Sequence, residues 1–303
     1  MTNVSRVILE DYQLRKTKKQ KQAFIDMMHS QFPTLQVQTS GIPKCRNLVI
    51  GDPETAKVIL GAHYDTCARL PFPNFITPKQ PLLSIGYSLL IVVPVLGIVF
   101  ALVWLLSRFI SDPLLLSWIS LLVYLLFLFL ILGGPANKHT ANDNTSGVIT
   151  LVEIYHRLTE EEKRKVCIVF FDNEEQGLLG SAQFRKIYKK DIKDKLMINF
   201  DCVSDGDTFL LGITKKANQK YHVPLAQAYT PTDTKAVLLE NLKKIYYPSD
   251  QAGFPMAIAV AALKYKKPFG YYMDRIHTKR DTVFQEENIQ YLAERTVRLI
   301  GHL

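Results

Sequence analysis

Five short segments of this chain carry histidine and acidic side chains of the kind that hold metal ions or move protons. In chain order they read HYD at 63–65, ANDNTSG at 141–147, FFDNEEQGLLGS at 170–181, NFD at 199–201 and IHTKRDT at 276–282. Imidazole nitrogen and carboxylate oxygen are ordinary ligands of zinc, and a carboxylate can bridge two ions. The segments therefore indicate a metal site that the fold assembles from five separate places.

Each segment taken alone also has a purely structural explanation. His63 suits a hydrogen-bonded core residue, and Asp143 suits the N-cap of a helix. Glu174 and Glu175 suit the solvated first turn of a helix, where carboxylates complement the helix dipole. No single segment decides between these interpretations, so the predicted metal site depends on all five occurring together.

The apolar stretches before these segments predict the strands that must position them. We expect strands at 47–50, 57–61, 166–171, 196–200 and 257–262, and helices at 7–32, 146–158, 180–189 and 286–299. Strands that alternate with helices predict an α/β fold, with a mostly parallel central sheet and helices on both faces. Open sheets of this kind place their functional sites at the carboxyl ends of the strands.

Two long apolar runs interrupt the chain between the first and second segments. Residues 82–110 include one charged side chain, Arg108, and residues 114–132 include none. At about 1.5 Å per residue the second run covers roughly 28 Å, close to the ~30 Å hydrocarbon core of a bilayer. Neither run has a polar face, which disfavours buried helices of a soluble core. We therefore expect a two-helix transmembrane hairpin.

The hairpin and the charges around it predict the topology. Residues 82–132 form the insertion, and residues 1–81 and 133–303 form the two parts of one α/β domain. Lys79 and Lys138 lie just outside the insertion, and the positive-inside rule then places the domain in the cytoplasm. The N-terminal sequence has no apolar stretch typical of a secretory signal. We therefore expect a multi-pass membrane protein with a cytoplasmic domain.

Composition narrows the classes of partner and site. The net charge of the 303 residues is +9, and the densest basic run, at 15–21, fits either attraction to anionic lipid headgroups or a solvated helix face. No aromatic and basic binding module accompanies this run, so no nucleic-acid partner is expected. The four cysteines form no CxxC pair, which predicts neither a disulfide framework nor a thiolate zinc site. Cys67 and Cys202 are expected to serve in packing.

In order and wording, the five segments resemble the zinc aminopeptidase family that contains the bacterial leucyl aminopeptidases and the glutaminyl cyclases. The resemblance extends from about residue 48 to the C-terminus, outside the hairpin. It implies that Asp143 bridges two zinc ions. One ion would be completed by His63 and Asp201, and the other by Glu175 and His277. Manganese or cobalt would suit the same ligands.

The resemblance also implies catalytic and positioning roles. Glu174 would be the general base that takes a proton from the attacking water and passes it to the departing amine. Asp65 would hold the imidazole of His63 in position. The peptide bond between Asp143 and Asn144 is expected to be cis.

One segment departs from the family pattern. Where the family often has Ser-Asp-His, this chain has Gln251 in place of the histidine, which puts the wall of the substrate pocket in doubt. The adjacent Tyr247, or Tyr246, is expected to donate a hydrogen bond to the oxyanion.

Three functions remain open at this point. The first is a metallo-aminopeptidase that hydrolyses N-terminal residues from peptides. The second is glutaminyl cyclisation, a transfer within the substrate that cyclases of this kind perform with a single zinc ion. The third is a non-catalytic membrane scaffold on a peptidase fold, which the retention of all five ligands and the base disfavours.

The hairpin likewise has three interpretations: a plain anchor, a homodimer interface, or one wall of a substrate entrance. Because it lies between His63 and Asp143, its ends must lie near the cleft, and the active site should adjoin the membrane surface. We therefore expect a preference for peptides at that surface. The sequence does not determine the preferred first residue.

Overall fold

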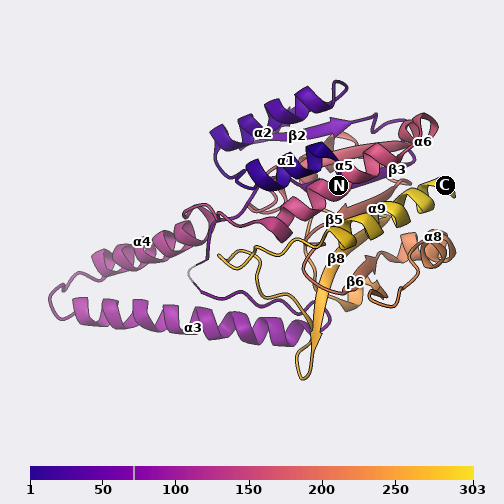
Figure 1. The fold of residues 1–303 in the computed structure, drawn as a ribbon. Helices are drawn as coiled ribbons and strands as arrows, with labels where there is room; N and C mark the ends of the chain where they lie inside the picture. The colour runs from indigo at the N-terminus through magenta and orange to yellow at the C-terminus, as the bar shows by residue number, and fades with distance from the viewer. Residues whose placement is uncertain (71) are drawn as a thin grey trace.

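A nine-stranded mixed sheet forms the centre of the protein (Figure 1). The structure is a computed structural model that describes residues 1–70 and 72–303. The strands lie in the order β1-β2-β4-β3-β5-β8-β6-β7, and β9 pairs with β8. Their bounds are β1 (Gln36–Ser40), β2 (Cys45–Ile50), β3 (Val58–His63), β4 (Val166–Phe171), β5 (Leu196–Phe200), β6 (Thr208–Ile213), β7 (Ala236–Asn241), β8 (Ala257–Lys266) and β9 (Gly270–Tyr272).

The parallel part of the sheet is its centre, where β4, β3, β5 and β8 run in one direction. The strands β2 and β6 join this centre in antiparallel fashion. Every residue of β3, β4 and β5 is buried, as expected for strands that are covered on both faces. The α/β class is therefore confirmed. The predicted strands at 47–50 and 57–61 are present, but they are not neighbours, because β4 lies between β2 and β3.

Helices cover both faces of the sheet (Figure 1). On one face, Leu60 joins a hydrophobic cluster with residues of α1, α2, α5 and α9, whereas the adjacent Ile59 joins a second cluster with Phe184 of α7. The alternation of neighbouring strand residues between two clusters is the pattern of a sheet that is packed on both sides. The helices of the domain are α1 (Asn3–Asp11), α2 (Lys18–Gln31), α5 (Gly147–Arg157), α6 (Glu160–Lys165), α7 (Leu179–Ile187), α8 (Lys215–Ala228) and α9 (Glu286–Gly301).

The helix predicted at 7–32 is wrong, because the structure has two helices there. Thr17 and Gln20 form a reciprocal capping box that starts α2, and α1 already ends at Asp11. A capping box satisfies the free amides of a new first helical turn, so it marks a helix start within the run. The intervening segment carries Arg15 into the interior, where its side chain is fully buried.

Two apolar helices, α3 (Pro81–Leu106) and α4 (Pro113–Leu132), extend from the domain side by side (Figure 1). Proline occupies the first position of each helix, where its missing amide costs nothing. Only 6% of the most apolar window of α3 is buried within the protein. Among the described residues, α3 alone is long and apolar enough to cross a membrane, since the comparable part of α4, Pro113–Phe129, is shorter.

The chain closes on itself where these helices leave the domain. Ala68 forms an antiparallel bridge with Ala136. The amide of Arg69 donates to the carbonyl oxygen of Pro135 at 2.8 Å, and the amide of Asn137 donates to that of Cys67 at 3.2 Å. The two ends of the insertion are thus joined before they reach the sheet.

Glu153 of α5 provides a test of how α1 is held to the domain. Its carboxylate accepts hydrogen bonds from the Thr2 amide at 2.6 Å and the Ser5 hydroxyl at 2.7 Å, and it pairs with Arg157 at 2.8 Å. Burial alone would raise the pKa of Glu153, but these partners lower it to about 2. The carboxylate therefore stabilises the fold above its ordinary pKa, and this contribution disappears as the pH falls towards 2.

We expect Glu153→Gln to reduce the free energy of unfolding at pH 7 by about 2 kcal/mol, because buried donors lose a charged acceptor. The difference from the wild type should shrink between pH 4.5 and pH 2. Denaturant unfolding of both proteins across this pH range measures it. The exposed Glu161→Gln is the control and should change stability by less than about 0.5 kcal/mol. A difference that is the same at every pH would contradict the assignment.

Candidate metal centre

The five predicted segments meet at the carboxyl ends of the parallel strands. His63 is the last residue of β3, and Glu174 and Glu175 follow β4. Asp201 follows β5, and His277 lies in the loop after β9. The remaining residue, Asp143, lies in the irregular helical turn η1 (Ala141–Ser146) that leads into α5. The structure thus brings together all the ligands expected from the sequence.

Asp143 lies between the imidazoles of His63 and His277. Its Oδ1 is 3.3 Å from Nε2 of His63, and its Oδ2 is 2.9 Å from Nε2 of His277. Nε2 of His63 is also 3.5 Å from Oδ1 of Asp201, and Nε2 of His277 is 3.4 Å from Oε2 of Glu175. One carboxylate therefore has an oxygen in each of two adjoining sets of ligand atoms.

The donor atoms suit divalent cations. The sets His63–Asp143–Asp201 and Cys67–Asp143–Glu175–His277 each place their ligand atoms within 4.8 Å of one another. The Oε1 atom of Glu175 is buried without a hydrogen-bond partner. A buried acceptor without a partner is costly, and a cation satisfies it. The mixture of imidazole and carboxylate is one that zinc binds.

The electrostatics of the cluster agree with a cation site. Burial raises the pKa of Glu175 to about 7, and the negative charge of Asp143 adds to the effect although His277 opposes it. Burial alone would lower the pKa of His277, but the negative charges of Glu175 and Asp143 have the larger effect and raise it to about 10. Carboxylates crowded into a low-dielectric pocket repel one another, and positive charge between them relieves the repulsion.

Asp65 holds the segment that carries the two glutamates. Its Oδ1 accepts from the amide of Glu174 at 2.9 Å, and its Oδ2 accepts from the amide of Glu175 at 3.3 Å. Its own carbonyl oxygen lies 3.0 Å from Nδ1 of His63, whereas its carboxylate is 3.7 Å from that nitrogen. Asp65 therefore contacts His63 through the main chain and positions the glutamates through its side chain.

Asp281 is a positioning residue that the sequence analysis did not identify. It is buried, and its two carboxylate oxygens accept from the amides of Asn142 at 2.9 Å and Asp143 at 3.0 Å. The only sequence signal was an acid within IHTKRDT.

The expected cis peptide bond between Asp143 and Asn144 is confirmed. The side-chain Nδ2 of Asn144 donates to the carbonyl oxygen of Phe200 at 2.9 Å, which ties this turn to β5.

Two cations of the basic run at 15–21 lie behind the metal ligands. Arg15 donates to the carbonyl oxygen of Tyr64 at 2.5 Å and to the Thr145 hydroxyl at 3.1 Å. Lys21 is buried and pairs with Asp172, just before the two glutamates. Neither a lipid-facing nor a solvated role fits these two side chains, so both interpretations of the run are wrong for them. Lys18 and Lys19 do face solvent.

Tyr247 and Gln251 belong to the segment whose sequence differs from the family pattern. The Tyr247 hydroxyl donates to the carbonyl oxygen of Asp201 at 3.0 Å, and the ring borders the cavity beside the cluster. Tyr246 also borders this cavity and is 58% exposed. Gln251 is buried, where it accepts from the side chain of Asn199 at 3.0 Å and donates to the carbonyl oxygen of Tyr247 at 2.7 Å. It supports Tyr247 from behind and is not among the residues that line the cavity.

Cys67 and Cys202 are buried close to the ligands. The Cys202 thiol donates to Oδ1 of Asp201 at 3.1 Å. Burial, strengthened by the nearby carboxylates, raises the pKa of both thiols well above the ordinary value for cysteine. Neutral buried thiols agree with the predicted packing role.

The fold and the arrangement of the candidate ligands can be compared with those of known proteins. Residues 129–299 match the model of peptidase family M28, and the chain belongs to this family. The resemblance found in the sequence is therefore confirmed.

Solved structures share this fold. The LapA aminopeptidase of Legionella pneumophila is 14% identical, with a TM-score of 0.55, over 99% of this chain and 69% of that one. The glutaminyl cyclase of Porphyromonas gingivalis is 17% identical, with a TM-score of 0.57, over 99% and 95%. A Zn-dependent exopeptidase of Parabacteroides distasonis is 15% identical, with a TM-score of 0.55, over 98% and 94%. At these identities the likeness establishes the fold and leaves the reaction open.

The ion pair between Lys21 and Asp172 leads to a stability prediction. We expect Lys21→Met to reduce the free energy of unfolding by about 3 kcal/mol, because it leaves a buried carboxylate without its cation. Lys19→Met, two residues away on the exposed face, should change it by less than about 0.5 kcal/mol. Denaturant unfolding measures both values. Equal losses for the two variants would mean that the buried pair does not stabilise the site.

Proposed function

We propose that this protein is a membrane-anchored aminopeptidase that holds two zinc ions and hydrolyses N-terminal residues from peptides. The observation that supports it most strongly is the position of Asp143, whose two oxygens face His63 on one side and His277 on the other. A ligand that is shared in this way suits a pair of ions better than a single one. Manganese or cobalt would suit the same donors.

The residues divide into two ligand sets with Asp143 in common. His63 and Asp201 would complete one set, and Glu175 and His277 would complete the other. When bound, zinc supplies a Lewis acid that polarises the scissile carbonyl group and makes water more acidic. Asp65 and Asp281 would keep the ligands in place, because their carboxylates hold the amides of Glu175 and Asp143.

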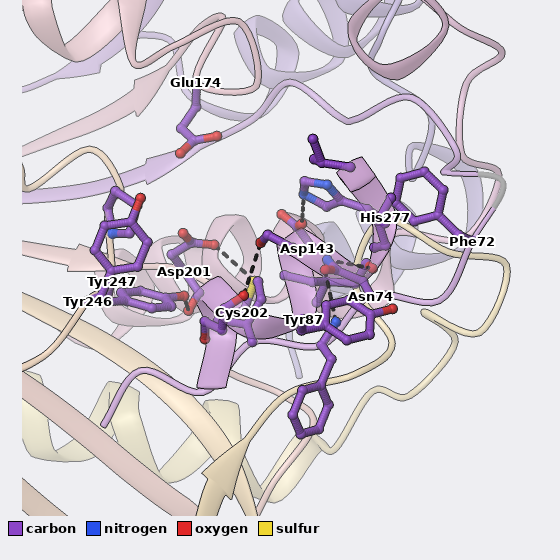
Figure 2. A pocket seen from close by; sticks show the side chains of 18 of the residues that line it. Phe72, Asn74, Tyr87, Asp143, Glu174, Asp201, Cys202, Tyr246, Tyr247 and His277 are labelled. Carbon is purple, nitrogen blue, oxygen red and sulfur yellow. Dashed lines mark hydrogen bonds and ion pairs between the residues drawn. The ribbon is translucent and has the colours of Figure 1, made fainter. Parts of the chain in front are cut away.

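Glu174 is proposed as the general base. Its carboxylate borders the cavity opposite Asp201 (Figure 2). Burial, reinforced by Glu175 and Asp250 and opposed by His63, raises the pKa of Glu174 well above that of an ordinary glutamate. A carboxylate with a raised pKa takes a proton from the attacking water more readily and can return it to the leaving amine. The hydrogen bond from its amide to Asp65 would fix its direction.

Tyr247 is proposed as the donor to the oxyanion. Its ring borders the cavity next to Asp201, so the phenol is within the site. Its hydroxyl hydrogen is directed to the carbonyl oxygen of Asp201. The proposed role therefore requires that the hydroxyl turn from this carbonyl to the developing charge of the substrate.

Membrane anchoring is the second part of the proposal. Leu90 and Phe100 of α3 are 74% and 72% exposed, which in water is unfavourable for side chains of this size. At about 1.5 Å per residue, α3 spans roughly 39 Å, which is enough to cross a bilayer, and the apolar part of α4, Pro113–Phe129, would enter it beside α3. Lys79 and Lys138 would then place the catalytic domain in the cytoplasm. A homodimer through α3 and α4 stays a prediction.

The number of bound ions tests the ligand assignment. We expect two zinc ions per chain in the purified protein, one after His277→Ala and none after Asp143→Ala, because only Asp143 belongs to both sets. Atomic emission of the dialysed proteins gives the count. One ion in the wild type would favour the cyclase, and no ion in any of them would favour a non-catalytic scaffold.

Removal of the proposed base tests the reaction. Glu174→Gln should retain its zinc and lose roughly a hundredfold to ten-thousandfold in kcat on aminoacyl amides, because an amide cannot accept the proton. The control is Glu294→Gln, on the exposed side of α9, which should keep wild-type kcat. Metal content and kcat are measured on the same preparation. Wild-type turnover by Glu174→Gln would refute the assigned base.

A further inference from the structure

Helix α3 has one polar stripe in an otherwise apolar sequence. Its hydroxyl-bearing residues are Ser84, Tyr87 and Ser88. With Ile91 they follow the spacing that places residues on one face of a helix. All four border the cavity that contains the ligands and Glu174. The one polar face of α3 is therefore the face that borders the cavity.

The cavity has a polar end and an apolar end. It encloses about 390 Å³, a size typical of small-molecule sites. The polar end is formed by the candidate metal ligands, including Asp143 and Asp201 (Figure 2). The apolar end is formed by Ile91 and Val92 of α3 and by Phe127 of α4. Val92 lies eleven residues into α3, about 16 Å along its axis from Pro81, so the cavity lining extends along the first turns of this helix.

The base of α3 is fixed to the domain, so this wall has a defined position. The Ser84 hydroxyl accepts from the amide of Thr77 at 2.9 Å. Tyr87 donates to the carbonyl oxygen of Pro73, and its ring packs on Phe75 with the ring centroids 5.8 Å apart. Phe75 itself lines the cavity. The loop that follows β3 and the first turns of α3 therefore form a continuous surface beside the metal ligands.

We propose that α3 and α4 form the wall that binds the first residue of the substrate, so that the enzyme selects peptides with a large apolar N-terminal side chain that is held at the depth of the bilayer. The occupant must be amphiphilic, because the same cavity offers ionisable groups at one end and aliphatic and aromatic side chains at the other. This inference rests on the proposed aminopeptidase function.

Substrate preference is the first readout. The full-length, zinc-loaded protein in detergent is assayed with the aminoacyl coumarins of Leu, Phe, Ser and Glu. We expect kcat/KM for Leu and Phe to exceed that for Ser and Glu by roughly tenfold or more, as apolar pockets discriminate. Equal values for the four substrates would overturn the proposal.

Matched variants of each helix then separate the cavity face from the outer face. Ile91→Trp narrows the cavity, whereas Ile85→Trp makes the same change at a residue that is 53% exposed and does not line it. We expect Ile91→Trp to raise KM for Leu and Phe about tenfold and KM for Ser less than threefold, and Ile85→Trp to leave all of them unchanged. In α4, Phe127→Ala changes a residue that lines the cavity, and Phe129→Ala, at a residue that is 63% exposed and does not line it, is the control. We expect only Phe127→Ala to change KM for Leu and Phe. Identical behaviour within each pair would show that the helices only anchor the enzyme.

A binding measurement distinguishes failure of this inference from failure of the proposed function. Fluorescence anisotropy follows a labelled Phe-Leu-Ala-Lys peptide, with Ser-Asn-Ala-Lys as the comparison, on the Glu174→Gln protein, where no turnover is needed. Tighter binding of the apolar peptide that Ile91→Trp weakens and Ile85→Trp does not would support the wall even if no coumarin is cleaved. Cleavage of coumarins together with equal binding of both peptides would leave the aminopeptidase in place and overturn the wall.

Discussion

The site depends on holding several carboxylates close together where little water can screen them. Ligand oxygens of Asp143 lie within 4.8 Å of those of Asp201 and of Glu175, and like charges at such distances repel strongly in a buried pocket. The parallel strands resist this repulsion, because their ends cannot separate without opening a sheet whose strands are buried on both faces. The carboxylates of Asp65 and Asp281 accept hydrogen bonds from backbone amides in the turns that carry the candidate ligands, and these bonds help to hold the turns in place. Arg15 and Lys21 bring positive charge to the rear of the same turns.

The centre of the fold was predictable from the sequence, and its edges were not. Strands β4 and β5 have the bounds that continuous apolar runs predicted, because strands buried on both faces leave that signature. The edge strands β1 (QVQTS) and β7 (AVLLEN) are only partly buried. No apolar run marks β1, and the short apolar run of β7 was not recognised as a strand. The break between α1 and α2 was missed because the capping box of Thr17 and Gln20 lies among basic residues that are typical of a continuous helix. In sequence, Arg15 and Lys21 look like surface residues, and only their partners explain their burial.

Five ordered motifs predicted the residues that meet in the candidate site, but not all of the residues that position them. Asp281 acts through amides that lie more than 130 residues earlier in the chain, and a sequence contains no sign of such a contact. That the hairpin could form a wall of the substrate entrance was one of three interpretations of the sequence, but the residues of α3 that line the cavity, such as Ser84 and Ser88, could not be identified within an apolar run. Helix direction and the closure at Ala68 decide which face of α3 meets the site.

The closed base of the insertion separates the apolar helices α3 and α4 from the strand ends that carry the candidate ligands. The chain leaves the sheet after His63 and returns before Asp143, yet the bridge between Ala68 and Ala136 joins its two sides first. In the membrane arrangement proposed above, a tilt of the free ends of α3 and α4 in a thinner or thicker bilayer would change the apolar part of the cavity, whereas the strand ends would keep the spacing of the candidate ligands. Lipid composition would then tune which substrates fit, with the reaction chemistry insulated from the membrane.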